Sequence, residues 1–543
     1  MDEHSRSLAD EELNAEVDLV GGIEPIAKDG GAPEEKAGVL GHEVTFFSAT
    51  MLNVAQMIGA GIYAVPGVIL TSVGSTGLFL IYWVLAPLFC FAGLSIYSEL
   101  ASMFPTRSGG EVVYLEQAYP RPRFLVSTAF AVTAVMTSLS ATNAIVFAGY
   151  FLSACGIPIT ATSQTVTAVG TIIVTSLVVA LSTKWSLRAV NVFSVFKILS
   201  LVFIVLTGAA VLSGLTPVKD PYSNFDNLFE GTSTNLNELT LGFVKVIYSF
   251  VGWHNAFNVL GEVKSRDPAR TLKRAGLLSV FLIAILFFFI NLAYVAAVPK
   301  EDMKNSGQLI AVVFFRNVFG TTGSKIFPLI ISCSSFGNII GVTVGQARML
   351  REVARQGLLP YPKFFASVKP FGTPIGPVGL RGFLTSMIIL ALPAKDAFNF
   401  VVDLASYPNQ FFQAATITGL WVLRRRRRKA NIEPSPLQTS NIIVIGYLCL
   451  CLLLIILPWV PPTPGHADVS FWYATYCVAG VALLLCCGLY YWLWIIVLPK
   501  YGNYEIVEEV EESSEGAKNT KLIRRYKNMS ADDETAPLLA TPR

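Results

Sequence analysis

The sequence predicts an all-α polytopic membrane protein with about twelve transmembrane helices. Its 543 residues are 53% hydrophobic and only 14% charged, whereas a soluble domain carries about 25% charged residues. Three long stretches contain no Asp, Glu, Lys or Arg, and each exceeds the roughly 20 apolar residues that a spanning helix needs: 44–98, 124–183 and 275–299. These observations exclude a soluble enzyme, and the continuous hydrophobicity of the stretches, without alternating polarity, disfavours a β-barrel.

Glycine and proline divide the apolar stretches into separate spans. Residues 74–77 separate the first span from the second, and Gly156 with Pro158 separates the third from the fourth. We expect twelve spans: 46–72, 77–103, 124–153, 165–182, 189–213, 240–261, 275–297, 323–347, 380–393, 397–423, 440–461 and 469–498.

Basic residues gather on one side of the predicted membrane. The loops place 22 Lys and Arg residues on the side of the two termini and six on the other side. Because cytoplasmic loops are rich in Lys and Arg, both termini are expected in the cytosol. The basic run 424–429 adjoins a span and is expected to lie beside anionic lipid of the bilayer, so no nucleic acid partner is predicted.

The two ends of the chain are polar. Residues 1–45 hold twelve acidic and three basic residues, and residues 499–543 hold nine and seven. Both are expected to be disordered cytosolic tails that sorting or ubiquitylation machinery could bind, and they flank a transmembrane domain over 46–498. The cysteines and histidines form no ligand grouping, so neither a metal nor a cofactor is predicted.

Two spans carry breaks in their middles. The first reads QMIGAGIYAVPG (56–67), where each interior glycine costs roughly 1 kcal/mol against alanine. The sixth reads YSFVGWHNAFN (248–258). Glycine in a membrane helix often serves close packing, but breaks at corresponding positions of two five-helix halves indicate an inverted-repeat transporter. Unwound backbone offers amides to a carboxylate and carbonyls to an ammonium, the two groups of an α-amino acid.

Three segments resemble amino acid permeases of the amino acid–polyamine–organocation superfamily, in particular the L-type amino acid transporters and fungal high-affinity methionine permeases. They are IGAGIYAVPG (58–67), SELASMFPTRSGGEVVYL (98–115) and GWHNAFNVLGEVKSRDPARTL (252–272). The resemblance covers about residues 44–500. It implies a LeuT-like fold with broken helices 1 and 6, in which two inverted five-helix repeats (about 46–213 and 240–423) precede two extra helices (440–498).

The resemblance also implies a substrate site at the breaks. It places a carboxylate on the amides of residues 59–61 and an ammonium on the carbonyls of Met57, Tyr248 and Val251, with the Tyr248 ring closing the pocket from outside. The predicted substrate-binding residues are Met57, Ile58, Gly59, Ala60, Gly61, Ile62, Tyr248, Val251, Gly252, Trp253 and Asn255.

Charged and polar residues inside the spans are further candidates. In sodium-independent relatives a lysine at the place of Lys197 stands where others bind the ion, which implies an ion substitute or a proton-coupling residue, held by carbonyls that the first break frees. The alternative is a lysine that reaches to the membrane surface. His254 and Asn338 are candidate pocket modulators, and His254 either titrates or is a satisfied buried imidazole. Lys245 and Asp403 either pair or reach separately to the surface.

The expected function is import of a neutral L-amino acid, methionine or another large neutral one, by alternating access, with proton coupling as an open question. Spans 3 and 8 offer no carboxylate, so a cationic side chain would enter an apolar site unpaired. The alternative is an amino acid sensor of the same fold that binds its substrate and signals through its tails. No enzymatic activity is expected, because the four histidines lie apart from any paired acidic site. The expected location is the plasma membrane.

Overall fold

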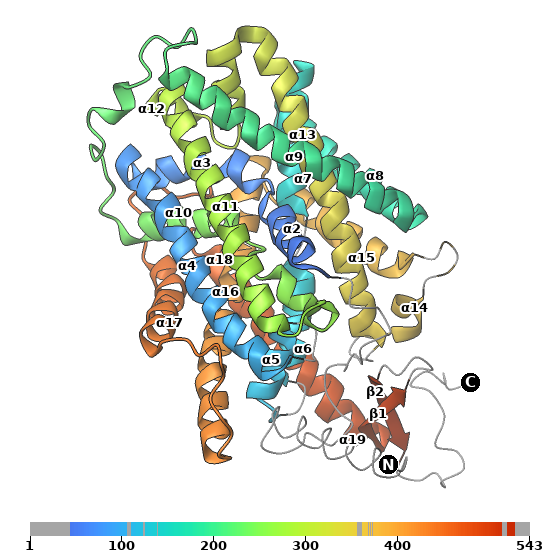
Figure 1. The fold of residues 1–543 in the computed structure, drawn as a ribbon. Helices are drawn as coiled ribbons and strands as arrows, with labels where there is room; N and C mark the ends of the chain where they lie inside the picture. Colours follow the sequence, from blue (N-terminus) through green and yellow to red (C-terminus); the bar gives the residue numbers. More distant parts are fainter. Residues whose placement is uncertain are drawn as a thin grey trace.

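A computed structural model describes residues 44–105, 110–122, 125–137, 140–355, 361–367, 369, 371, 373–512 and 518–526. Figure 1 shows long helices bundled side by side. The helices of the first part are α2 (Phe46–Met57), α3 (Gly61–Val73), α4 (Thr76–Met103), α5 (Glu111–Ala118), α6 (Leu125–Thr137), α7 (Ala141–Cys155), α8 (Ala161–Leu181), α9 (Thr183–Leu212) and the short 3-10 helix η1 (Ser223–Phe225).

The second part of the chain adds further helices and one hairpin. The helices as far as the basic run are α10 (Leu236–Ser249), η2 (Asn255–Glu262), α11 (Pro268–Ala297), α12 (Lys300–Asn305), α13 (Ile310–Arg355), α14 (Pro362–Ala366), α15 (Ile375–Ala391) and α16 (Ala394–Lys429). They are followed by α17 (Asn441–Ile456), η3 (Leu457–Trp459), α18 (Thr475–Tyr491), η4 (Trp492–Val497), α19 (Leu498–Gly502), β1 (Tyr504–Glu512) and β2 (Lys518–Tyr526).

The described helices confirm the prediction of an all-α polytopic membrane protein. Eight helices are long and apolar enough to cross a membrane, or nine if the bent pair α2 and α3 is one span. Each coincides with a predicted span: Phe46–Met57 with Gly61–Val73, Thr76–Met103, Thr128–Cys155, Ala161–Leu181, Val195–Leu212, Pro268–Ala297, Ile310–Arg351, Asn441–Trp459 and Thr475–Gly502.

Three predicted spans fall on helices that do not meet that criterion of length and hydropathy. The span 240–261 is interrupted between α10 and η2. Helix α15 has 17 residues. Helix α16 has 36 residues but carries amides along its middle, at Asn409, Gln410 and Gln413. The count of twelve spans in two inverted repeats therefore stays a proposal.

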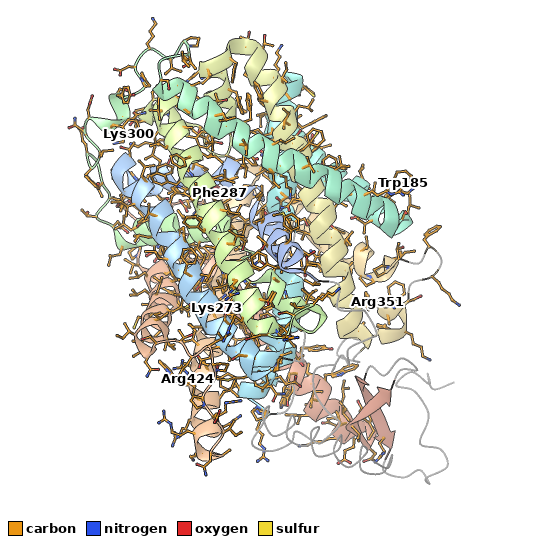
Figure 2. All side chains as sticks on the ribbon, in the orientation of Figure 1. Trp185, Lys273, Phe287, Lys300, Arg351 and Arg424 are labelled. Atoms are coloured by element: carbon orange, nitrogen blue, oxygen red, sulfur yellow. The ribbon has the colours of Figure 1, made fainter. Side chains whose placement is uncertain are left out.

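The bundle has a basic end and an opposite end. Figure 2 shows Lys273, Arg351 and Arg424 toward one end, called the basic end below, and Lys300 toward the other, called the opposite end. At the basic end Glu99 accepts two hydrogen bonds from the guanidinium of Arg424, at 2.7 and 2.6 Å. The Glu99 side chain is 1% exposed, so this ion pair joins α4 to α16 inside the protein.

Local sequence explains where the helices around the breaks begin and end. Thr45 caps α2, since its Oγ1 accepts the Ser48 amide at 3.2 Å, and Asn235 caps α10 by accepting the Asn237 amide at 2.8 Å. Such side-chain caps satisfy amides that have no partner within the helix. Gly74 ends α3 with φ of 77°, a conformation in which glycine has no steric penalty. These helices pack in pairs, α3 against α10 and α2 against both α11 and η2.

The tail from residue 499 is expected to be disordered, but its described part is folded. Helix α19 is followed by an antiparallel hairpin of β1 and β2 (Figure 1). Its register sets Glu505 opposite Arg525, and a pair of opposite charges across antiparallel strands is stabilising. Residues 1–43 and 527–543 lie outside the described residues.

Candidate functional site at two helix breaks

The first span is broken where the glycines predict it. Helix α2 ends at Met57, α3 begins at Gly61, and their axes differ by 48°. Between them Ile58 leaves helical geometry, with φ −77° and ψ 81°, whereas Ala60 is already close to helical, with φ −68° and ψ −22°. The first amides of a helix have no carbonyl of that helix to bind, so the start of α3 directs unpaired N–H groups toward the break.

The sixth span is also broken at its middle. Helix α10 ends at Ser249, and the chain resumes as the 3-10 helix η2 at Asn255. Gly252 lies in between with φ of 112°, which only glycine adopts readily. The Val251 side chain is 43% exposed, so solvent reaches this break within the bundle.

The two breaks pack directly against each other. A β-carbon at Gly61 would lie 2.7 Å from Ser249 Oγ and 3.0 Å from its Cα. A β-carbon at Gly252 would lie 2.6 Å from Cγ of Gln56. These separations are shorter than carbon contacts allow. Glycine is therefore required on both sides of the contact, and the backbones of the two predicted segments meet at one place.

Helix α7 forms one wall beside the breaks. The Tyr248 hydroxyl donates to Thr142 Oγ1 at 2.8 Å, and Asn143 Oδ1 accepts from Asn338 Nδ2 at 3.0 Å. A β-carbon at Gly59 would lie 3.2 Å from that same Asn338 nitrogen. Asn338 and Tyr248 are thus both at the site where they are predicted, and α7 joins them to one another.

Lys197 reaches this site from α9. Its side chain is buried, at 4% exposure, and Nζ donates to Asn338 Oδ1 at 2.9 Å. The expected acceptors were carbonyls of the first span, and the structure places an amide oxygen of α13 there instead. The backbone around the lysine is tied to α3, because Ser200 bonds both the Lys197 carbonyl and the Tyr63 hydroxyl, each at 2.7 Å.

Three predicted residues after the second break face away from Tyr248. Trp253 is buried against Tyr97 of α4, with ring centroids 5.0 Å apart. His254 Nε2 lies 3.4 Å from Glu111 Oε1. Asn255 donates to the carbonyl of Leu52 at 3.4 Å. These side chains hold the break against α4, α5 and α2, whereas Met57, Ile58, Ala60 and Ile62 are buried at the first break.

The two halves of the first span differ in burial. In α3, twelve of thirteen residues are buried, and Gly67 packs against Met303, Ser306 and Gly307 near the opposite end. In α2, Leu52 is 37% exposed and Gln56 is also exposed. The site is therefore closed toward the opposite end and more open along α2, toward the basic end.

Sequence reasoning did not single out Thr142 or Asn143. They lie in a span (Thr128–Cys155) that also holds several other Ser and Thr residues, so the single amide side chain in that stretch, Asn143, was the available signal.

Sequence reasoning also left undecided whether the side chains of Lys245 and Asp403 form an ion pair. Lys245 Nζ lies 3.5 Å from Asp403 Oδ1 and donates to Asp468, and Lys245 is fully buried, so the lysine does not reach to the surface.

Comparison with known proteins identifies the family of the chain. The profile of a family described as amino acid permease matches residues 44–484. A high-affinity methionine permease of Saccharomyces cerevisiae is 34% identical over 88% of this chain and 84% of its own length. A low-affinity methionine permease of the same yeast is 27% identical over 89% and 88%. A b(0,+)-type amino acid transporter 1 of Mus musculus is 28% identical over 86% and 91%.

Proposed function

Because the chain belongs to the amino acid permease family, we propose that it is a secondary transporter that imports neutral L-amino acids by alternating access. The observation that carries the proposal is the meeting of two broken spans, with Gly61 against Ser249 and Gly252 against Gln56. Broken helices at the middle of a membrane protein are tolerated where they line a cavity. They supply the polar backbone that an amino acid needs.

The proposed substrate contacts are made by backbone. The amides of Gly59, Ala60 and Gly61, which lead into α3, bind the carboxylate, and the positive end of the helix dipole adds to that attraction. In this structure the Gly59 N–H donates to the Met57 carbonyl at 2.9 Å, and the substrate would replace this bond. The carbonyls of Met57, Tyr248 and Val251 bind the ammonium. These two groups are common to all α-amino acids, so the backbone contacts select for the class rather than for one side chain.

The side-chain preference is proposed from the polar groups beside the breaks. Thr142, Asn143 and Asn338 are neutral, and Lys197 is a cation. A cationic substrate side chain would meet a like charge there, which disfavours it. A neutral side chain carries no such cost. Since a relative at 34% identity is named a high-affinity methionine permease, methionine is the first substrate to test.

Lys197 is proposed to hold the site together with a fixed positive charge, in the place where related transporters hold sodium. Its bond to Asn338 sets the charge next to Gly59. A lysine within a spanning helix is costly, about 2.5–3.5 kcal/mol at the helix centre on insertion scales, which supports a functional role. The same position would allow it to release and take up a coupling proton.

The basic end is proposed to face the cytosol of a cell whose plasma membrane holds the transporter, with both tails on that side. Lys273, Arg351 and Arg424 lie at this end (Figure 2), as the positive-inside rule requires. In that orientation the more exposed half-helix α2 lies on the cytosolic side of the first break and the buried half-helix α3 on the outer side. A sensor that only binds an amino acid is the alternative, and the relatives named permeases and transporters favour transport.

Uptake by purified protein tests the proposal. Proteoliposomes should accumulate radiolabelled L-methionine, with competition by other large neutral amino acids and little by lysine or glutamate. An imposed pH gradient, acid outside, tests proton coupling in the same vesicles. Binding of methionine without flux under any gradient would favour the sensor, and no binding of any amino acid would refute both.

A further inference from the structure

One polar side chain of α2 lies outside the predicted site and yet contacts its second break. Asn53 is fully buried, four residues before the end of α2. Its Oδ1 accepts the amide N–H of Ala256 at 2.8 Å, and its Nδ2 donates to Ser279 Oγ at 3.3 Å. The side chain therefore joins the first span to η2 and to α11.

The orientation of the Asn53 amide follows from its partners. The Ser279 hydroxyl donates to the carbonyl of Gly276 at 2.9 Å, so its oxygen is left to accept the hydrogen bond from Nδ2. The Ala256 N–H can only donate, so it requires the oxygen of the Asn53 amide. Exchanging the two ends of the amide would place donor against donor, and this fixes the assignment.

The N–H that the Asn53 oxygen accepts belongs to a residue that lies between two locally bonded amides of the break. Asn255 N–H donates to Gly252 O at 3.1 Å, and Phe257 N–H donates to His254 O at 3.0 Å. Ala256, between them, is fully buried, and its N–H turns to α2. A side-chain oxygen that accepts an amide at a helix start is an N-cap, and here the cap comes from a different span.

The same face of α2 supports the rest of the break. Gln56 lies one turn further along α2, and its side chain packs under Gly252. The carbonyl of Leu52 accepts from the Asn255 side chain at 3.4 Å. Residues 252–256 thus rest on consecutive turns of α2, with Asn53 as the fully buried polar contact.

We propose that Asn53 is a positioning residue for substrate binding, which caps η2 so that residues 250–254 stay unwound. The inference rests on the proposed function, since it assigns the ammonium to the carbonyls of Tyr248 and Val251. The Tyr248 carbonyl accepts the Val251 N–H at 3.1 Å in the turn that ends α10, and its second lone pair remains for the ammonium. Without the oxygen of Asn53, the Ala256 N–H regains a partner if the break rewinds toward a continuous helix. Rewinding would also engage the Val251 carbonyl, which the ammonium is proposed to use.

Two variants separate the cap from simple packing. Asn53→Leu keeps the volume but removes the acceptor. Ser279→Ala removes the other hydrogen bond of Asn53 and leaves the cap intact. The readout is the dissociation constant for L-methionine in purified protein, together with elution as a single species in detergent.

We expect Asn53→Leu to weaken methionine binding by about tenfold or more, the scale of leaving one buried amide unpaired. Ser279→Ala should stay within about threefold of the parent protein, since the cap remains. Wild-type affinity in a folded Asn53→Leu protein, or an equal loss in Ser279→Ala, would overturn the proposal.

Hydrogen exchange gives a measurement that does not depend on a variant folding or on the ligand. In the unmodified protein the Ala256 amide should exchange slowly, as a buried and hydrogen-bonded amide does, although it adjoins a break. Rapid exchange at Ala256 would overturn the cap. If the unmodified protein binds neither methionine nor another neutral amino acid, the proposed function fails, while slow exchange at Ala256 would still show the cap.

Discussion

Lys197 Nζ lies 2.9 Å from Asn338 Oδ1, and the other end of the same amide donates to Asn143 at 3.0 Å. The Asn338 side chain of α13 therefore contacts both α9 and α7. The Asn338 nitrogen also lies where a β-carbon of residue 59 would meet it, at 3.2 Å. The Asn338 amide is thus the group through which a change in the charge at residue 197 is expected to affect the position of side chains at the first break.

Replacing Lys197 by Met tests the role of this charge. The variant keeps the apolar stem, so we expect surface expression to remain. Uptake should fall at least about tenfold, equivalent to roughly 1.4 kcal/mol, and its dependence on external pH should flatten. Lys197→Arg should also lose uptake, because the guanidinium is larger and does not deprotonate. Normal uptake with an unchanged pH profile in Lys197→Met would remove both proposed roles.

The glycine at the first break provides a second test. A side chain at residue 59 enters the space where the substrate carboxylate is proposed, and its nearest neighbour is a movable side chain, Asn338. Gly59→Val should therefore reach the surface and lose binding and uptake. Gly170→Val is the matched control, because a β-carbon at Gly170 has no atom within 4 Å. If Gly59→Val is retained inside the cell as misfolded protein, the glycine serves packing instead.

The buried charges around Lys245 make a prediction about stability. Lys245→Met leaves the carboxylates of Asp403 and Asp468 without their cation. Breaking a buried pair in this way costs about 3–5 kcal/mol, and we expect a clear drop in the thermal midpoint in detergent. Combining Lys245→Met with Asp403→Asn should recover part of it. Lys304→Met is the control, since its pair with Glu301 is largely exposed and should contribute about 1 kcal/mol or less.

The sidedness of the bundle can be checked with a native cysteine. Cys155 ends α7 and is exposed, in a loop predicted to face outward. A membrane-impermeant maleimide added to intact cells should label it, and Cys155→Ser should abolish that part of the labelling. A cysteine at Lys273, in the basic end, should react only after permeabilisation. The reverse pattern would contradict cytosolic termini.

Backbone features of the site could be predicted because they leave a local signature. Gly59, Gly61 and Gly252 mark the two breaks in the sequence itself, since glycine inside a helix is unfavourable. The partners of polar side chains leave no such signature. Asn338 lies 141 residues from Lys197, and Ser279 lies 226 residues from Asn53, so these contacts depend on which helices pack together.

The described part of the C-terminal tail shows a second reason why structure could not be predicted from the sequence. Its high charge favours disorder when charge is counted along the chain. Pairing of the two strands depends instead on which residues lie opposite each other across the hairpin. The register sets Glu505 opposite Arg525, a pairing that composition does not reveal.

The ion pair of Glu99 and Arg424 has a consequence for synthesis in the membrane. The two residues are 325 positions apart, and chains elongate at about 5–20 residues per second, so Glu99 exists for roughly 16 to 65 seconds before its partner is made. An unpaired carboxylate is costly in hydrocarbon, and Glu99 lies four residues before the end of α4. The carboxylate is therefore expected to stay at the water-facing end of α4 until α16 is made. The contact between these two helices forms late, after the helices between them have been synthesised.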